Sequence, residues 1–230
     1  MAEILSFPFM QRALFAALLT GLLGGLLGVF LVQKRLSFLA AGVSHSTFAG
    51  IGLGLALGIA PFLAAVPMAV AVGAALALLR QRGTLPEDAV VGILFAAGMA
   101  TGVVLLSLSG ANASLPAYLF GSILAIRPVD LLFLGVITVI GVGFVLGFWG
   151  RLTLITFDRQ LAQASGVPVR FLDYAFFITS SVAIVATVKL IGVILVSSFF
   201  VVPSATARLL GSTFATVTAC PDLLTPARSI

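Results

Sequence analysis

The stretch Leu36–Leu79, LSFLAAGVSHSTFAGIGLGLALGIAPFLAAVPMAVAVGAALALL, contains no Asp, Glu, Lys or Arg across its 44 residues. A membrane-spanning helix needs about 20 predominantly apolar residues, so this stretch is long enough to cross a bilayer twice. Near its middle, the segment Gly58–Pro61 predicts the turn between the two crossings. The stretch therefore predicts a helical hairpin in a membrane, with the single histidine of the chain, His45, inside its first helix.

The composition of the whole chain agrees with a membrane protein. Of its 230 residues, 61% are hydrophobic and 8% are charged, whereas a soluble domain carries roughly 25% charged residues. The net charge of +5 comes from basic residues scattered between apolar segments, which indicates membrane topology rather than nucleic-acid binding. The lone cysteine, Cys220, excludes an internal disulfide and a site built from several cysteines. The apolar segment that follows Glu3 is interpreted as a retained span rather than a signal peptide.

The charge-free segments predict an all-α polytopic membrane protein with about seven transmembrane helices and one short or re-entrant helix. The short segment is Leu115–Ile126, which does not have the length to cross the bilayer comfortably. Residues 1–210 are expected to form one transmembrane domain, and residues 211–230 a short, atypical tail that resembles a truncated end. Besides the two helices of Leu36–Leu79, the expected spans are Ala13–Gln33, residues 89–108, Leu131–Gly150, Tyr174–Val188 and Leu190–Ala207.

Basic residues predict the orientation of the helices, because lysine and arginine favour the cytoplasmic side. We place the pair Lys34-Arg35 on the inner side. Most other basic residues then lie on the same side if Leu115–Ile126 enters and leaves the membrane from the outer face. Lys189 separates the last two spans, and it lies either at the outer turn of a hairpin or within a helix with its side chain extended towards the interface. The residues assigned to the cytoplasm are Lys34, Arg35, Arg80, Arg82, Arg151, Arg159, Arg170 and Arg208.

His45 is the first candidate for a functional site. An imidazole is costly to bury in hydrocarbon, and it suits zinc, or manganese and iron together with oxygen ligands. The hydroxyls of Ser37, Ser44, Ser46 and Thr47 lie close to it in the sequence. Neither a histidine nor a carboxylate lies one helical turn away, which favours a weak, transient metal site on a transport path over a tight cage. The alternative is a histidine that forms a hydrogen bond between helices.

The adjacent acidic residues Glu87 and Asp88 are the second candidate. Pro86 precedes them and suits the start of a helix, and carboxylates in the first helical turn interact favourably with the helix dipole. This capping role is the simpler interpretation. The functional alternative is a ring of negative charge at the cytoplasmic mouth of a cation path.

The third candidate, residues 155–168, lies in the longest polar stretch. Asp158 is expected to cap a short helix that ends at Gly166, and a proline two positions later prevents its continuation. Such a helix fits a groove on a partner protein, with Leu161 and Val167 supplying apolar contacts; an ordinary surface loop is the alternative. The residues assigned to this coupling helix are Phe157, Asp158, Leu161, Ala162 and Gly166.

Four motifs together resemble the permease family of zinc- and manganese-importing ABC transporters, over about Phe9 to Leu210. A basic pair, a Leu-Ser-Phe-Leu run and a Ser-His step occupy residues 34–45. The acidic pair precedes Gly92-Ile93, and a Phe-Asp run that ends in Gly-Val-Pro occupies residues 157–168. The fourth motif is a Lys-x-x-Gly-Val-x-Leu-Val-Ser run that leads to Ala-Arg-Leu, over residues 189–209.

The chain departs from the family pattern at two places. Many members carry Asp four residues before the histidine, where this chain has Ala41. The resemblance therefore implies that His45 lacks its carboxylate partner, and loss of that hard oxygen ligand favours zinc over manganese. The chain also ends in a short polar tail where family members continue through one or two further spans.

The resemblance implies a helical bundle like that of type II ABC importers. It also implies a transport subunit without catalysis of its own, in the inner (plasma) membrane of a bacterium. A cytoplasmic ATPase subunit would hydrolyse ATP, since the chain has no Gly-x-x-x-x-Gly-Lys-Ser/Thr loop. An extracytoplasmic metal-binding protein would deliver the divalent metal, zinc in preference to manganese. Two permeases would form a homodimer in membrane lipid, and neither a cofactor nor nucleic acid is expected.

Two other classes of protein stay open as alternatives. An ion-coupled secondary transporter would be expected to hold carboxylates inside its spans, and this chain has none well inside one. A membrane-embedded enzyme would use His45 or a serine, but the sequence has no Gly-x-Ser-x-Gly or His-Glu-x-x-His motif. Both alternatives are therefore less favoured than a transporter subunit.

Overall fold

The computed structural model describes residues 7–83, 86–109, 121 and 127–210. Within these ranges every regular element is an α-helix, which confirms the predicted all-α class. Two predictions fall outside the described residues: the short helix within Leu115–Ile126, apart from Gly121, and the tail at 211–230. The helices in chain order are α2 (Pro8–Gln33), α3 (Leu39–Ala56), α4 (Pro61–Arg82), α5 (Glu87–Leu108), α7 (Pro128–Gly147), α8 (Trp149–Phe157), α9 (Arg159–Ala164) and α10 (Val169–Leu210).

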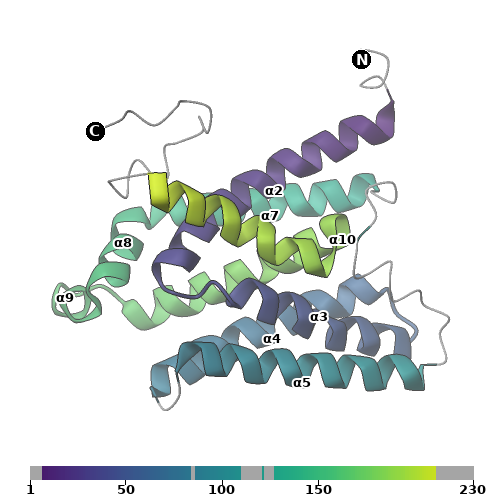
Figure 1. Ribbon diagram of the computed structural model, residues 1–230, viewed down its shortest axis with the longest axis horizontal. Helices are drawn as coiled ribbons and strands as arrows, with labels where there is room; N and C mark the ends of the chain where they lie inside the picture. Colours follow the sequence, from purple (N-terminus) through teal and green to yellow (C-terminus); the bar gives the residue numbers. More distant parts are fainter. Residues whose placement is uncertain (1–6, 84–85, 110–120, 122–126, 211–230) are drawn as a thin grey trace.

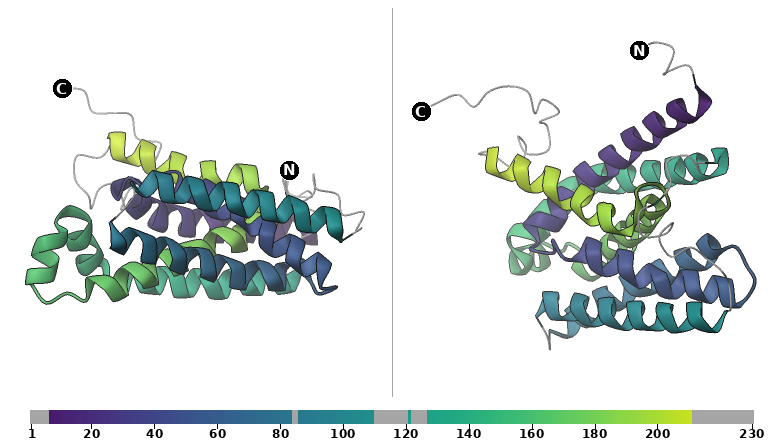
Figure 2. Two further views of the ribbon diagram at one scale, coloured as in Figure 1. Left: turned by 90° about the horizontal axis from the view of Figure 1, so that it is seen from below. Right: turned by 45° about the vertical axis from the view of Figure 1, so that its right-hand side comes forward.

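Six of the described helices, all except α8 and α9, are long and apolar enough to cross a membrane. They pack into a bundle, and α8 and α9 project from one end of it (Figures 1 and 2). The turn predicted at Gly58–Pro61 is confirmed, because α3 ends at Ala56 and Pro61 opens α4. Gly58 adopts a left-handed φ of 67° there, which a glycine tolerates without a steric penalty.

Two predicted boundaries are wrong. The span expected over Leu131–Gly150 ends at Gly147, because Phe148 leaves the helical conformation (φ −112°, ψ 17°) and a separate helix begins after it. The break between the last two spans lies at Gly192, not at Lys189. Lys189 is helical, whereas Gly192 has φ 82° and ψ 160°, a conformation that residues with a Cβ rarely adopt.

The long helix α10 is therefore a hairpin that turns at Gly192. Asp173, near its start, lies 3.3 Å from Lys34, and Arg208, near its end, lines a cavity together with Arg35. Both ends of α10 thus lie at the end of the bundle that holds the basic pair after α2. With the five other apolar helices, the two legs give seven crossings in the described part of the chain, as the sequence predicts.

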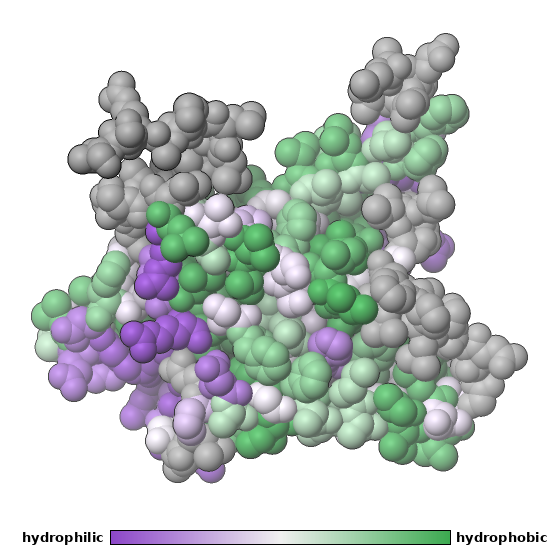
Figure 3. Space-filling view, viewed as in Figure 1, coloured by the Kyte–Doolittle hydropathy of each residue, from purple (hydrophilic) through white to green (hydrophobic). Residues whose placement is uncertain are grey.

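Basic side chains from distant parts of the chain gather at this same end. Arg80 and Arg159 lie within 4.0 Å of Asp173, as Lys34 does. Figure 3 shows hydrophilic surface around the projecting α8 and α9, whereas much of the remaining visible surface is apolar. We call this end the cytoplasmic end, because lysine and arginine favour that side of a membrane.

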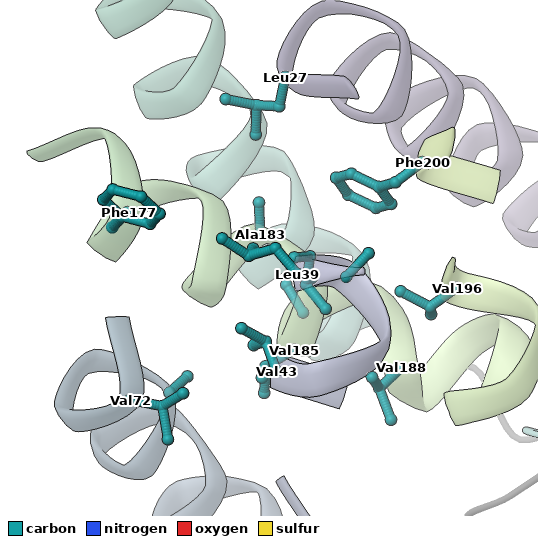
Figure 4. Close-up of a cluster of buried hydrophobic side chains, with 14 of the residues drawn as sticks. Leu27, Leu39, Val43, Val72, Phe177, Ala183, Val185, Val188, Val196 and Phe200 are labelled. Atoms are coloured by element: carbon teal, nitrogen blue, oxygen red, sulfur yellow. The ribbon is translucent and has the colours of Figure 1, made fainter. Parts of the chain in front are cut away.

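Helix α3 packs against α4, α5 and α10. Its contact with α5 is close because of small residues: a Cβ on Gly102 would lie 2.5 Å from the backbone carbon of Phe48. Figure 4 shows part of the core, in which Leu39 and Val43 of α3 approach Val72 of α4 and Val185 of α10. The core therefore holds the helix that carries His45 between three others.

Candidate functional site

His45 lies within α3 with its ring against two phenylalanines. The ring centroid is 4.7 Å from that of Phe95 on α5 and 6.3 Å from that of Phe48 on its own helix. The ring is partly exposed, but its Nδ1 atom is buried and has no hydrogen-bond partner among the described residues. A hydrogen bond between helices, the alternative considered for this residue, is therefore not formed by Nδ1.

The hydroxyls near His45 serve helix packing. Ser44 Oγ donates to the carbonyl of Ala41 at 3.0 Å and lies 3.4 Å from that of Val193 on α10. Ser46 Oγ lies 2.7 Å from the carbonyl of Gly42 on its own helix and 2.9 Å from that of Leu94 on α5. Their protons are thus directed at backbone carbonyls, which satisfies buried polar groups across helix contacts.

The described residues contain no group of three or more His, Cys, Asp or Glu side chains that could hold a metal ion. Ala41, one helical turn before His45, supplies a methyl group where a carboxylate would add an oxygen ligand. A single imidazole with a buried, unpaired nitrogen can bind a metal ion weakly. The described residues of this chain do not form a closed metal site around His45.

An open cavity lies at the cytoplasmic end, where α3 and α5 begin. It has a volume of about 630 Å³. Phe95 connects the two regions, because its ring lies 5.8 Å from that of Phe38 at the cavity wall and 4.7 Å from His45. The cavity is lined by Val32, Arg35, Ser37, Phe38, Asp88 and Arg208.

The acidic pair at the start of α5 is thus brought to this cavity through Asp88. Asp88 and Phe95 lie on one face of α5, about two helical turns or 10 Å apart. Glu87 is the first residue of α5, and its side chain lies outside the description. The pair occupies the first helical turn, where its negative charge complements the helix dipole. Capping and a place at the mouth of the cavity are therefore compatible roles for Asp88.

The predicted cap of the third candidate segment is confirmed. Asp158 adopts an extended conformation before α9, and its Oδ1 accepts a hydrogen bond from the Leu161 amide at 2.9 Å. Gly166 follows the helix with φ 74°, and the Val167 amide donates to the Ala162 carbonyl at 3.0 Å. This combination of an aspartate before the helix and a left-handed glycine after it fixes the short helix at both ends.

The two faces of this segment differ. Ala162 is fully buried in a small apolar cluster with Ile155, Val169 and Leu172, and the half-buried Val167 packs against the same cluster. Val167 therefore contributes to packing inside this chain. Two apolar side chains assigned to the segment point outwards instead: Phe157 is 68% exposed and Leu161 is 53% exposed. They lie on the part of the molecule that projects beyond the bundle (Figure 1).

A family profile described as the ABC 3 transport family matches residues 6–225 of the chain. The chain belongs to the ABC 3 transport family. It is 32% identical over 214 residues to the manganese transport system membrane protein MntC of Halalkalibacterium halodurans, covering 90% of this chain and 72% of that protein. It is also 31% identical over 204 residues to the high-affinity zinc uptake system membrane protein ZnuB of Haemophilus influenzae, covering 86% of this chain and 78% of that protein.

Solved structures of ABC transporters share the fold. The structure titled PsaBC from Streptococcus pneumoniae in complex with Fab matches with a TM-score of 0.80 and 25% identity, covering 95% of this chain and 79% of that chain. A structure titled as an inward-facing conformation of a putative metal-chelate type ABC transporter matches with a TM-score of 0.72 and 21% identity, covering 92% and 71% of the two chains. The predicted ABC-importer-like bundle is confirmed.

Membership of the ABC 3 transport family defines the general role of the chain. It is a membrane permease subunit of an ABC transporter and not an enzyme, and ATP is hydrolysed by a separate ATPase subunit. It is a multi-pass protein of the bacterial inner membrane. These findings confirm the predicted class, while the roles of His45, the acidic pair and α9 stay predictions.

Sequence reasoning missed two acidic residues of this ABC 3 permease that form ion pairs across the bundle. Asp173 contacts Lys34, Arg80 and Arg159 at the cytoplasmic end. Asp130, at the start of α7, lies 2.6 Å from Lys189. Each of these two acidic residues lies beside a charge-free span, and this is a signal that the sequence contains. The signal does not identify the basic residue with which the carboxylate pairs.

Proposed function

We propose that this permease imports a divalent metal ion and prefers zinc to manganese. The proposal rests on one observation: His45 is a partly exposed imidazole whose buried Nδ1 has no partner among the described residues, and Ala41 occupies the position one turn before it. Nitrogen ligands suit zinc, whereas manganese and ferrous iron favour sites richer in oxygen. The relatives named for manganese and zinc transport support the metal class but include both ions.

We place the metal path along the face of α3 and α5 that carries His45 and Phe95. An ion that leaves His45 would pass Phe95 and reach the cytoplasmic cavity, where Asp88 offers an oxygen ligand. Weak sites suit such a path, since a tightly bound ion would stop the flow. Asp88, together with Glu87, would attract the ion at the inner mouth.

We further propose that two copies of the permease form the pathway. One imidazole is an incomplete site, since zinc in proteins is usually bound by three or four ligands. A homodimer related by a twofold axis would bring the equivalent histidine of the second copy to the same path. An extracytoplasmic binding protein would deliver the ion to the outer face of this dimer.

We assign α9 as the docking helix for the cytoplasmic ATPase. The exposed side chains of Leu161 on α9 and of Phe157, the last residue of α8, supply an apolar contact of the kind that a groove on a partner accepts. The Asp158 cap and the Gly166 turn hold the helix in a fixed conformation before docking. Less conformational entropy is then lost on binding.

The decisive test of the metal preference is uptake of labelled zinc and manganese, in competition, by the permease reconstituted with its ATPase and binding protein in liposomes. We expect zinc to be taken up in preference. A preference for manganese in the unmodified complex would overturn the assignment. The variant Ala41→Asp, which adds a carboxylate one turn from His45, should shift the preference towards manganese.

The docking assignment has a separate test. Leu161→Asp places a charge on the proposed docking face, and we expect it to abolish co-purification with the ATPase. Leu209→Asp is a suitable control, since Leu209 is 88% exposed at the cytoplasmic end but lies outside α9. Normal co-purification and normal stimulated hydrolysis with Leu161→Asp would refute the assignment.

A further inference from the structure

One buried carboxylate at the cytoplasmic end joins four helices. Asp173, near the start of α10, has Oδ1 3.3 Å from Lys34 Nζ and 3.9 Å from Arg80 Nη1. Its Oδ2 is 2.7 Å from Arg159 Nη1, a close charge contact that lacks the angle of a hydrogen bond. Lys34 follows α2, Arg80 lies in the last turn of α4, and Arg159 is the first residue of α9.

Burial makes this cluster sensitive to the loss of its acidic member. The side chains of Asp173 and Lys34 are 1% and 2% exposed, whereas those of Arg80 and Arg159 are 19% and 35% exposed. Burial lowers the pKa of the Lys34 ammonium, and the Asp173 carboxylate counteracts that shift. Removing one partner of a buried ion pair leaves an uncompensated charge. Here the loss of Asp173 would leave three cations close together.

Aromatic rings hold two of the cations in place. Lys34 Nζ lies 4.9 Å from the ring centroid of Phe176, and the Arg80 guanidinium lies 5.6 Å from that of Phe177. Both rings belong to α10, one turn after Asp173. Cation–π contacts add to the ion pairs and restrict the positions of the side chains. The ends of α2 and α4 are therefore fixed to α10 at this point by charge as well as by packing.

Helix α9 reaches α2 and α4 through this carboxylate. Its buried residue, Ala162, packs against residues of α8 and α10. The Arg159–Asp173 contact extends the connection, because the same carboxylate also contacts Lys34 and Arg80. A displacement of α9 would therefore change the charge balance at the ends of both helices.

The cluster is next to the cytoplasmic cavity. Val32, two residues before Lys34, and Arg35, directly after it, both line that cavity. Arg35 has a left-handed φ of 59°, which a residue with a Cβ rarely adopts, so the chain turns sharply directly after Lys34. A shift of Lys34 cannot easily be absorbed by this tight turn, and it would move the cavity wall.

We propose that Asp173 is a positioning residue that couples movement of α9 to the cytoplasmic ends of α2 and α4, and thereby to the cavity at the inner mouth. The proposal rests on the assignment of α9 as the docking helix. In this mechanism the ATPase displaces α9, Arg159 moves relative to Asp173, and the contacts of Asp173 with Lys34 and Arg80 rearrange. Docking itself does not require Asp173.

The test compares transport with ATP hydrolysis in the reconstituted complex. For Asp173→Asn we expect normal co-purification with the ATPase and continued hydrolysis, but at least a tenfold fall in metal ions transported per ATP hydrolysed. Arg159→Gln should give a fall in the same direction, and it removes the most exposed member of the cluster. Arg159→Lys, which keeps the charge, should recover much of the ratio.

Arg170→Gln is the matched control, since Arg170 is an exposed arginine at the start of the same helix as Asp173. It should leave the ratio unchanged. If Asp173→Asn does not fold, Arg159→Gln decides the question. An unchanged ratio in Arg159→Gln overturns the coupling role, whatever the effect of Asp173→Asn on stability. Failure of the docking assignment is seen separately, as normal co-purification of the Leu161→Asp variant.

Discussion

Lys189 Nζ lies 2.6 Å from Asp130 Oδ1, and this ion pair ties α10 to the start of α7 at the end of the bundle opposite the Asp173 cluster. Asp130 also accepts a hydrogen bond from the Arg127 amide at 3.0 Å and so caps α7. The Lys189 ammonium lies 5.7 Å from the ring centroid of Phe62, near the start of α4. Lys189 combines features of the two positions considered for it, because it is helical and lies three residues before the turn at Gly192.

We predict that this pair contributes about 1 kcal/mol or less to stability, because the Lys189 side chain is 36% exposed and water screens the interaction. Asp130→Asn removes the charge but keeps an oxygen that can cap α7. A double-mutant cycle with Lys189→Met, measured by denaturant unfolding of the detergent-solubilised permease, gives the coupling energy. Strictly additive losses in the double variant would show that the two side chains do not stabilise each other.

The contact between α2 and the return leg of α10 should be sensitive to single methyl groups. A Cβ on Gly28 would collide with the carbonyl oxygen of Phe200 and with Ser204 Oγ. We predict that Gly28→Ala destabilises the permease by roughly 1–3 kcal/mol, the usual cost of overpacking. Gly25→Ala on the same helix is the control, since no atom lies within 4 Å of its added Cβ. Equal thermal stabilities of the two variants would contradict the close packing of these legs.

His45→Ala should abolish or strongly weaken metal uptake while membrane insertion and assembly with the ATPase are retained. Uptake should fall because the variant lacks the imidazole that binds the metal ion. Insertion and assembly should be retained because alanine adds neither a charge nor a larger side chain to the helix contact. Val104→Ala on α5, where Val104 is 57% exposed, serves as the control for removing side-chain atoms from a span. Uptake at the unmodified rate by His45→Ala would place the metal path elsewhere.

The cap of α9 should matter for coupling more than for global stability. Asp158→Ala removes the acceptor for the Leu161 amide and should cost about 1 kcal/mol locally. We expect weaker stimulation of the ATPase, because the docking helix is then less often in its folded form. Asp158→Ser restores a capping oxygen and should restore the stimulation. If serine and alanine behave alike, the loss comes from the missing charge and not from the cap.

Local patterns in the sequence were enough to predict the membrane class, the approximate spans and the end of the bundle that holds the basic residues. These features depend on local composition, since a predominantly apolar run of about 20 residues predicts a spanning helix. The turn at Gly58–Pro61 and the cap at Asp158 were also predictable, because each involves residues a few positions apart. The ring of Phe95 beside His45 was not, since it belongs to another helix.

The pairing of the charged side chains and the position of the turn in α10 depend on the packing of the whole fold. Lys34 and Asp173 are separated by 139 residues, and no local pattern specifies such a contact. Lys189 looked like the break in the last hairpin because a charge in hydrocarbon is costly. Asp130 compensates that charge in the fold, so the helix continues to Gly192, which alone of the two can adopt the required backbone conformation without strain. Interactions between residues close in the sequence therefore determine where the helices form. Packing between residues distant in the sequence determines which charged side chains pair.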